Sequence, residues 1–217
     1  MRRPSEPFRV GFVGTGAIAG VHLDAVTRVP GAVLVGVTDQ DAARARDFAA
    51  RARGVRVFPD IAAMVAAGVG VIHVLTPPHA HAEAALEALE HGCHVLVEKP
   101  LATSDTDCTR LAEVASRRGR RVGVNHSLLA DPHVRHVLAT VAAGRVGQPL
   151  SAEYFCSAAY PPWQDGPLPA HYREGGNPFR DLGVHGLYLL RAVLGEIEHV
   201  APVFTSRGGD PNLCHDE

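Results

Sequence analysis

Short apolar runs alternate with longer amphipathic stretches along the first 125 residues of the chain. Continuous apolar runs are typical of strands in a parallel sheet that is covered on both faces, and the amphipathic stretches have the helical period. The predicted strands are Phe8–Val13, Val33–Val37, Val55–Phe58, Val71–Leu75, His94–Val97 and Val122–Val124. The predicted helices are Ala17–Val29, Asp41–Arg53, Asp60–Ala67, Ala80–His91 and Ser104–Arg118. This alternation predicts βαβ units and an α/β fold, a Rossmann domain with a doubly wound parallel sheet over residues 1–125.

The pattern changes after Asn125. The segments predicted beyond it are helices over Pro132–Ala143 and Phe179–Leu194 and strands over Leu150–Ser157 and His199–Thr205. A long loop rich in proline and glycine, residues 159–177, lies between them. This mixture predicts a second unit of α+β type over residues 126–217, with an open, largely antiparallel sheet.

The second unit lacks enough elements to cover a sheet face, and exposed strand edges are a liability. The chain also stops at Asp216-Glu217 in a polar tail without a closing element. We therefore expect this domain to be truncated. The alternative is that a partner subunit covers the open face.

Composition narrows the class of protein. A chain of 217 residues with 46% apolar residues has material for one or two domains, and its net charge of -2 suggests no electrostatic binding of nucleic acid or membrane. No stretch approaches the roughly 20 apolar residues of a membrane span, and Arg9 and several glycines argue against a signal peptide. The four cysteines show no CxxC spacing, so we expect no metal site, and free thiols in a reducing cytoplasm.

A glycine-rich loop follows the first predicted strand. Its residues Gly14-Thr15-Gly16-Ala17-Ile18-Ala19 have the form G-x-G-x-x-A, and a helix begins there. The first glycine permits a tight turn, the second lets the backbone approach a pyrophosphate, and the small third residue lets helix and strand pack closely. Glycines alone often only make turns, but a strand before and a helix after favour a dinucleotide site.

Asp39 stands at the end of the second predicted strand, about 23 residues beyond Gly16, where a carboxylate can bind the ribose 2′-OH. Such a carboxylate would repel a 2′-phosphate. NAD is therefore the expected cofactor, with NADP as the alternative. Arg44 and Arg46 lie nearby in the sequence, and we expect both to point from the next helix to solvent.

The residues after the fourth strand form a second candidate segment, because ligands in open α/β sheets bind beyond the carboxyl ends of the strands. The segment reads Thr76-Pro77-Pro78-His79-Ala80-His81. Its two prolines force an extended exit, which would place Thr76 and Pro77 along the nicotinamide side of the cofactor. His79 is a further candidate for the cofactor site, whereas we expect His81 to be solvated at the start of the next helix.

The fifth strand ends in Glu98-Lys99-Pro100, and the sixth ends in Asn125-His126. A Glu-Lys pair is usually just a solvated charge pair. Here the pair follows a buried strand, and Pro100 restricts the backbone after it. Lys99 could therefore donate a hydrogen bond to a substrate hydroxyl or carbonyl. We assign Glu98, Lys99 and Asn125 to the cofactor side of the site.

Together these segments resemble the Gfo/Idh/MocA oxidoreductases, the relatives of glucose–fructose oxidoreductase and inositol dehydrogenase. The motifs are G-x-G-x-x-A, T-P-P-H-x-H and E-K-P, and the segment from Gly175 to His185 resembles the family's glycine-led D-x-G-x-H helix. The resemblance covers about Phe8 to Thr205. It implies hydride transfer between NAD(P) and a hydroxyl or carbonyl of a sugar, cyclitol or related polyol. A homo-oligomer formed through the second-domain sheet is also expected.

The resemblance further implies that Lys99 and His185 act in the catalytic centre, with Asp181 beside them. Asp181 and His185 are four residues apart on a predicted helix and so share one face. A histidine suits the base that takes a hydroxyl proton, Asp181 could steady the imidazolium, and Lys99 could polarise the oxygen. On the helix alone, a helix-start acid and a core histidine would also explain the pair. For the whole chain, the alternative is a catalytically inactive NAD(P)-binding sensor or assembly subunit.

Overall fold

The computed structural model describes residues 7–156 and 182–201. The chain forms two compact units, Met1–Asn125 and His126–Glu217. Within the described ranges, no helix combines the length and the apolar character that crossing a membrane requires.

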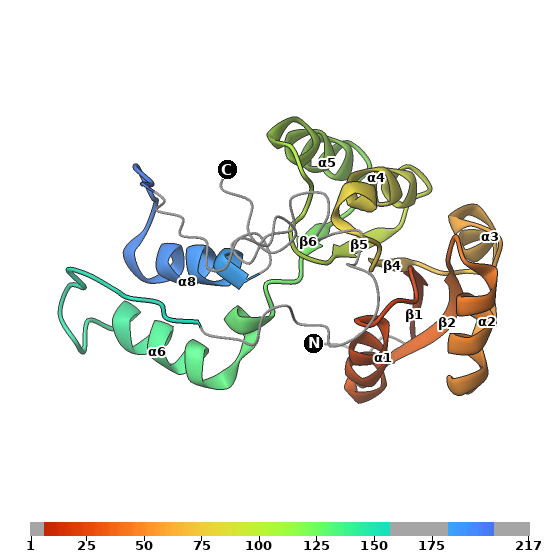
Figure 1. Cartoon of the computed structure of the whole chain (residues 1–217), viewed down its shortest axis with the longest axis horizontal. Coiled ribbons are helices and arrows are strands. Elements are labelled where there is room, and N and C mark those ends of the chain that lie inside the picture. Colours follow the sequence, from red (N-terminus) through yellow and green to blue (C-terminus); the bar gives the residue numbers. More distant parts are fainter. Residues whose placement is uncertain (1–6, 157–181, 202–217) are drawn as a thin grey trace, which may run out of the picture. The chain divides into compact units, whose positions relative to one another are not determined.

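The first unit is built on a six-stranded parallel sheet with the order β3-β2-β1-β4-β5-β6 (Figure 1). The strands are β1 (Phe8–Val13), β2 (Ala32–Thr38), β3 (Arg56–Val57), β4 (Val71–Val74), β5 (His94–Val97) and β6 (Val122–Val124). The strand order reverses direction between β1 and β4, and this is the place where doubly wound sheets bind their ligands. The predicted α/β fold and parallel sheet are confirmed.

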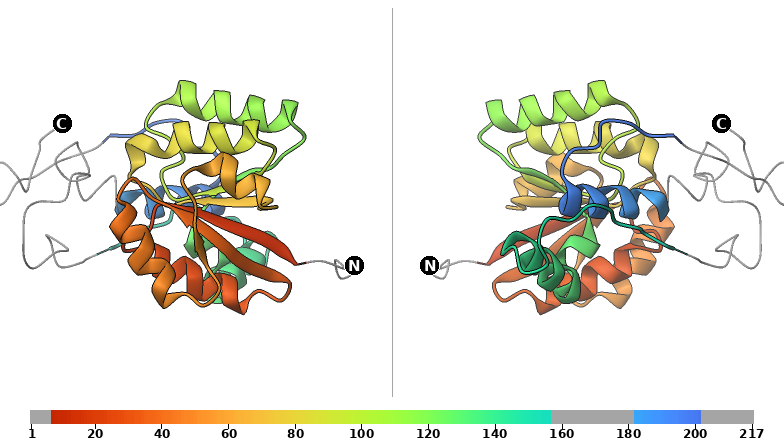
Figure 2. Two further views of the ribbon diagram at one scale, coloured as in Figure 1. Left: turned by 90° about the vertical axis from the view of Figure 1, so that its right-hand side faces the viewer. Right: turned by 90° about the vertical axis from the view of Figure 1, so that its left-hand side faces the viewer.

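Helices cover both faces of this sheet (Figure 2). They are α1 (Ala19–Arg28), α2 (Ala42–Arg51), α3 (Ile61–Ala66), α4 (His81–Glu90) and α5 (Asp105–Arg117). The helices α1 and α2 bury Phe12 and Phe48 against one face, and α3, α4 and α5 bury Ile72 and Leu111 against the other. Buried side chains on both faces explain why the strands read as continuous apolar runs.

Polar side chains fix where three of these helices begin. Asp41 accepts hydrogen bonds from the N–H groups of Ala43 and Arg44, Asp60 accepts one from Ala63, and Ser104 accepts one from Asp107. Each cap satisfies a backbone donor that the first helical turn leaves without an intrahelical partner. The α1 helix differs, because no side chain caps its N-terminus.

The second unit contains a short helix η2 (Ser127–Ala130), α6 (Pro132–Ala142) and α8 (Val184–Leu194) in its described residues. The strand predicted over Leu150–Ser157 is wrong for its described part, because residues 150–156 form no ladder with any described segment. A segment with alternating apolar residues forms a strand only when a neighbouring segment pairs with its backbone N–H and C=O groups. Leu150 remains 94% exposed and Phe155 87% exposed. The second-domain sheet stays a prediction.

Gly14 marks a close approach between the ends of β1 and β4. Its φ angle is +95°, and a Cβ atom at this position would lie 2.8 Å from the carbonyl carbon and oxygen of Leu75. The same Cβ would lie 2.9 Å from the backbone nitrogen of Thr76. All of these neighbours are backbone atoms, so only glycine fits.

We predict that Gly14→Ala lowers the free energy of unfolding by roughly 2 kcal/mol or more, because it combines a left-handed backbone with a steric overlap. Urea unfolding followed by circular dichroism measures the loss. Gly20→Ala is the matched control, since Gly20 lies in α1 with nothing within 4 Å of its Cβ position. This control should gain up to about 1 kcal/mol from helix propensity. Equal stability of the Gly14→Ala variant and the wild type would contradict the prediction.

Candidate functional site

The loop between β1 and α1 leaves space for a ligand. A Cβ atom built on Gly16 meets nothing within 4 Å, whereas Ala19 is fully buried against the sheet. No side chain caps the N-terminus of α1, so its positive end is available to an anion. An open glycine beside an uncapped helix start fits the pyrophosphate of a dinucleotide.

Asp39 ties this loop to the end of β2. Its Oδ2 atom accepts hydrogen bonds from the backbone nitrogen of Thr15 at 2.7 Å and from Thr15 Oγ1 at 2.8 Å. Its Oδ1 atom accepts a third from the backbone nitrogen of Asp41 at 2.9 Å. The side chain is only 7% exposed. Asp39 therefore shapes the glycine loop as well as placing a negative charge beside it.

Arg44 is exposed on α2 and also lies near two carboxylates. The side chain is exposed, but its guanidinium lies 3.9 Å from Asp39 and 3.4 Å from Asp41. The expected exposure of Arg44 is therefore confirmed, although the guanidinium also lies near the carboxylates of Asp39, after β2, and Asp41, at the start of α2. Arg46 is exposed, as expected.

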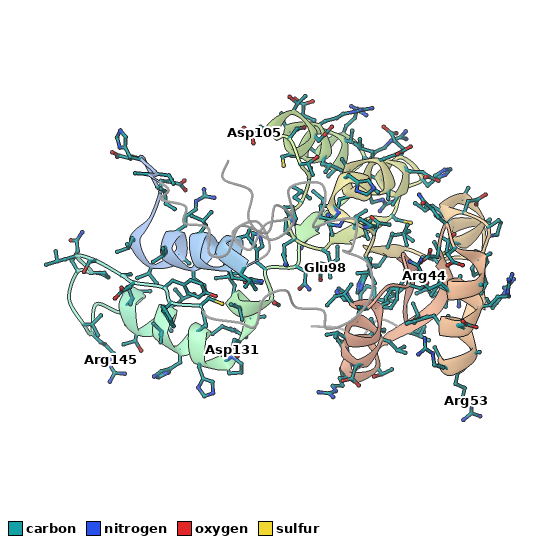
Figure 3. All side chains as sticks on the ribbon, in the orientation of Figure 1. Arg44, Arg53, Glu98, Asp105, Asp131 and Arg145 are labelled. Carbon is teal, nitrogen blue, oxygen red and sulfur yellow. The ribbon has the colours of Figure 1, made fainter. Side chains whose placement is uncertain are left out.

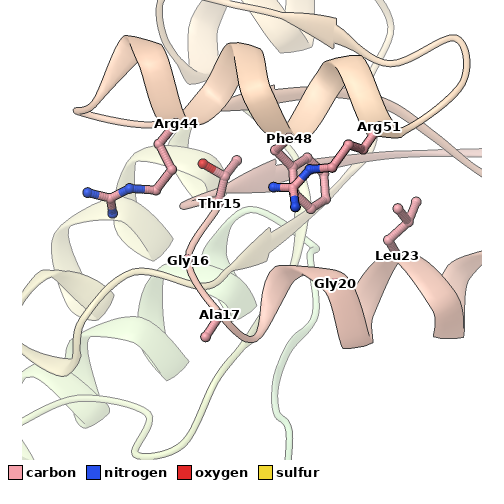
Figure 4. A pocket seen from close by; sticks show the side chains of 8 residues that line it. All are labelled: Thr15, Gly16, Ala17, Gly20, Leu23, Arg44, Phe48 and Arg51. Carbon is pink, nitrogen blue, oxygen red and sulfur yellow. The ribbon is translucent and has the colours of Figure 1, made fainter. Parts of the chain in front are cut away.

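A pocket of about 600 Å³ lies between α1 and α2 beside the glycine loop (Figure 4). It is lined by Thr15, Gly16, Ala17, Gly20, Leu23, Arg44, Phe48 and Arg51. In Figure 4, Arg44 and Arg51 extend from α2 over the pocket, while the loop and α1 form the other wall. The pocket thus offers cationic groups next to the open Gly16.

The segment after β4 is fixed by His81. Its ring is 1% exposed, with Nδ1 2.6 Å from the carbonyl oxygen of Pro100 and Nε2 2.7 Å from that of Thr76. The expectation of a solvated His81 is wrong, because the ring ties the Thr76 segment to the cis peptide Lys99–Pro100. Burial lowers the pKa of His81, although both carbonyl contacts favour the protonated ring.

Thr76 carries a buried hydroxyl that has no hydrogen-bond partner among the described residues. Buried polar groups are normally paired, so an unpaired one at a strand end fits a place where a ligand supplies the partner. Pro77 and His79 follow and are exposed. The segment after β4 therefore combines the unpaired hydroxyl of Thr76 with the exposed side chains of Pro77 and His79.

Glu98, labelled in Figure 3, is the centre of a partly buried polar cluster that the sequence did not predict. Its Oε1 atom lies 2.8 Å from Nε2 of His22 and accepts a hydrogen bond from Asn125 Nδ2 at 2.6 Å. Its Oε2 atom accepts one from the backbone nitrogen of Lys99 at 3.3 Å. His22 in turn faces His73 across 3.0 Å between their Nδ1 atoms. The cluster joins α1, β4, β5 and the residue after β6.

The surroundings of this cluster shift two pKa values. Burial, and then the neighbouring His22, lower the pKa of His73 from 6.5 to about 4. Burial would raise the pKa of Glu98, but hydrogen bonds from His22 and Asn125 outweigh it and hold the pKa below its usual value. At neutral pH the cluster therefore contains a carboxylate anion and a neutral His73.

His185 is held inside the second unit by Tyr188. The Nδ1 atom of His185 lies 2.5 Å from the hydroxyl of Tyr188, which is buried and also accepts a hydrogen bond from the backbone nitrogen of Leu128 at 3.4 Å. The ring of Tyr188 stacks on that of His126 with centroids 4.3 Å apart. Asp181, the predicted partner of His185, lies outside the described residues.

The predicted residues of the first unit gather at one edge of its sheet. Strand ends and the loops after them carry Gly14, Gly16, Ala17, Ile18, Ala19, Asp39, Thr76, Pro77, His79, Glu98, Lys99 and Asn125. Lys99, which is the chain's only lysine, belongs to this unit, and His185 belongs to the second. Within the described residues, no three His, Cys, Asp or Glu side chains are placed to bind a metal ion.

Sequence reasoning missed His22, His73, His81 and Tyr188. His22 and His81 stand on the inward faces of amphipathic helices, and His73 interrupts an apolar strand. The sequence signal for these residues is a histidine at a position where the helical or strand pattern calls for an apolar side chain. It does not identify the partner, because the contacts of His22 span 51 and 76 residues of sequence.

Two family models match the chain. The model described as an oxidoreductase family with an NAD-binding Rossmann fold matches residues 8–126. The model of the GFO/IDH/MocA C-terminal domain matches residues 134–212. Both belong to the group that the sequence motifs resemble.

Individual relatives and solved structures are also similar to this chain. Inositol 2-dehydrogenase 3 from Saccharopolyspora erythraea is 42% identical over 147 residues, which are 66% of this chain and 43% of the relative. The crystal structure of GenD2 from gentamicin A biosynthesis in complex with NAD has a TM-score of 0.73 and 26% identity, over 89% of this chain and 55% of that one. KijD10, a 3-ketoreductase from Actinomadura kijaniata in complex with NADP and TDP-benzene, has a TM-score of 0.59 and 32% identity, over 64% and 43%. The chain spans about half the length of the curated relatives it matches.

Thr15→Val tests the bond between the glycine loop and Asp39. We predict a loss of roughly 1 to 2 kcal/mol in the free energy of unfolding, because the variant removes one hydrogen bond to a buried carboxylate. Thr15→Ser, which keeps the hydroxyl, should stay within about 0.5 kcal/mol of the wild type. Urea unfolding measures both variants, and equal losses in both would show that the hydroxyl does not matter.

The low pKa of His73 predicts a loss of stability in acid. The unfolded chain takes up a proton on this histidine near pH 6.5, while the folded protein resists it until about pH 4. Stability should therefore fall as the pH drops from 6.5 to 4, by about 3 kcal/mol for a shift of this size. Glu98 adds a further loss below its unfolded pKa of 4.5, since protonation removes its hydrogen-bonded anionic form. Urea unfolding of wild type and His73→Phe at pH 7.5, 5.5 and 4.5 tests this, and identical pH curves for the two proteins would refute it.

Proposed function

Because the chain belongs to the GFO/IDH/MocA family of oxidoreductases, we propose that it binds NAD and transfers a hydride between this cofactor and a hydroxyl or carbonyl carbon of a sugar, cyclitol or related polyol. The observation that carries the proposal is the gathering of Gly16, Asp39, Thr76 and Lys99 at one edge of a sheet with Rossmann topology. The names of the relatives support the substrate class, since they include inositol dehydrogenases and a 3-ketoreductase.

The residues of the first unit fit a dinucleotide. Gly16 and the uncapped start of α1 would hold the pyrophosphate, and Asp39 would accept a hydrogen bond from the adenosine ribose. Pro77, His79 and Asn125, with the unpaired hydroxyl of Thr76, would line the nicotinamide side. The anionic Asp39 favours NAD over NADP, and the nearby Arg44 weakens this preference by offsetting part of the charge.

The catalytic roles follow from the chemistry of each side chain. When bound, NAD supplies the hydride acceptor for alcohol oxidation. Lys99 would donate a hydrogen bond to the substrate oxygen and stabilise its developing negative charge. His185 would take the hydroxyl proton, and Asp181 would stabilise the resulting imidazolium.

Several wider features belong to the proposal. The relatives are named dehydrogenases and reductases, which favours an enzyme over the non-catalytic sensor or assembly subunit. Free thiols at Cys93, Cys108 and Cys156 are consistent with the reducing cytoplasm. A homo-oligomer formed through the second-domain sheet completes the expected organisation.

Lys99→Ala and His185→Asn test the catalytic roles. We expect each to lower kcat/KM for NAD-dependent polyol oxidation by about 10²-fold or more, since each removes a group that acts in the transition state. Absorbance of the reduced nicotinamide over a panel of inositols and sugars measures turnover. Isothermal titration should show that both variants bind NAD within about threefold of the wild type.

The matched control is His136→Asn, which changes an exposed histidine on α6 and should leave turnover intact. Full turnover in both the Lys99→Ala and the His185→Asn variants would remove these two residues from the mechanism. Binding of NAD without turnover of any tested polyol in the wild type would favour the sensor.

A further inference from the structure

The cluster around Glu98 contains two histidines for which the proposed reaction has no use. His22 comes from α1 and His73 from the middle of β4, and both are packed beside the ring of Phe12, which stacks on His73 with centroids 5.2 Å apart. Placing polar groups in a sheet interior is unfavourable unless each finds a partner. Here His73 pairs with His22, and His22 pairs with the carboxylate of Glu98. This chain of contacts connects the two histidines to the segment that carries Lys99.

The contacts dictate where the protons lie. Glu98 is an anion, so Nε2 of His22 must carry a proton and donate it to Oε1 across 2.8 Å. When His22 carries only this one proton, its Nδ1 atom is bare, and the facing Nδ1 atom of His73 donates across 3.0 Å. Two bare nitrogens or two N–H groups at that distance would repel each other. The anionic Glu98 and the proton on His73 therefore favour the same tautomer of His22, and the two contacts reinforce each other.

The carboxylate of Glu98 connects this arrangement of protons to the backbone of Lys99. Its Oε1 atom is held by His22 and Asn125, which leaves Oε2 to accept the backbone N–H of Lys99. On the other side of the same turn, His81 holds the carbonyl of Pro100. The Lys99–Pro100 segment is thus held at two points, the N–H of Lys99 and the carbonyl of Pro100, and the first depends on the state of Glu98.

We propose that His73 is a positioning residue for Lys99, which acts by fixing the tautomer of His22 and thereby keeping Glu98 anionic and oriented. The catalytic consequence rests on the proposed dehydrogenase function, whereas the proton arrangement itself does not. The hydrogen-bond contact of His73 is with His22, and His73 also interacts electrostatically with Glu98, so its influence on Lys99 passes through these two residues.

The effect should depend on pH. The titratable groups around Glu98 are His22 on α1, His73 on β4, His81 on α4 and Lys99 next to it in the chain. Without the donor on His73, only Glu98 itself favours the tautomer of His22 that donates to the carboxylate, so the preference for this tautomer weakens. The pKa of the Glu98 carboxyl then rises, and protonation disrupts the turn at a higher pH than in the wild type.

His73→Phe removes the nitrogen and keeps the aromatic stack on Phe12, while His73→Asn restores a donor near the position of Nδ1. In kcat/KM profiles from pH 5 to 9, the acid limb of His73→Phe should move up by roughly one pH unit, a tenfold loss near pH 6, with little change at pH 9. His73→Asn should return the limb to within about 0.3 pH units of the wild type. The control His94→Phe changes a half-buried histidine on the neighbouring β5, which contacts Arg121 instead of the cluster, and should leave the limb in place.

A parallel shift of all three profiles, or no shift in His73→Phe, overturns the proposal. Imidazole ¹⁵N chemical shifts of the full chain at pH 7.5 provide a test that needs no turnover. The wild type should show His22 protonated at Nε2 and His73 at Nδ1, and His73→Phe should lose the single tautomer of His22. A His22 protonated at Nδ1 in the wild type overturns the proposal even if the enzyme is active. The expected tautomers in a protein that oxidises no polyol would support it while counting against the proposed function.

Discussion

The carboxylate of Glu98 is the group on which the functional edge of the sheet depends. It receives hydrogen bonds from a helix on one face, from the residue after β6 and from the backbone of Lys99. A buried charge is tolerated only when such donors surround it, and their removal leaves an uncompensated anion. The requirement to satisfy this one anion therefore fixes α1, β5 and β6 relative to one another where the cofactor motifs meet.

Asp39 is a second anion held in a comparable way on the other side of β1. Thr15 donates to it twice, and Asp41 once. The two carboxylates differ in their surroundings, because Asp39 has the cationic Arg44 beside it, whereas His22, the amide of Asn125 and the backbone N–H of Lys99 bind Glu98. In the proposed function Asp39 also binds a ribose hydroxyl, whereas the carboxylate of Glu98 bonds to groups of the fold itself.

The features predicted from the sequence are those that depend on a pattern of neighbouring residues. Alternating apolar and amphipathic stretches predicted the sheet and helices, and the spacing of Gly14, Gly16 and Asp39 predicted the cofactor loop. The histidine cluster depends on contacts between distant segments, so no local pattern predicts it. The segment 150–156 shows the converse case, since its alternation is real but a strand also needs a partner to pair with.

The two candidate catalytic side chains are organised by different means. The first unit orders Lys99 through a carboxylate and the ring of His81, so the group proposed to polarise the substrate is tied to the cofactor-binding fold itself. The second unit orders His185 through the hydroxyl of Tyr188, which also binds the backbone at Leu128. This contact orients His185 through a hydrogen bond with a hydroxyl group. The proposed mechanism assigns the acid beside the imidazole to Asp181, whose carboxylate would raise the basicity of His185.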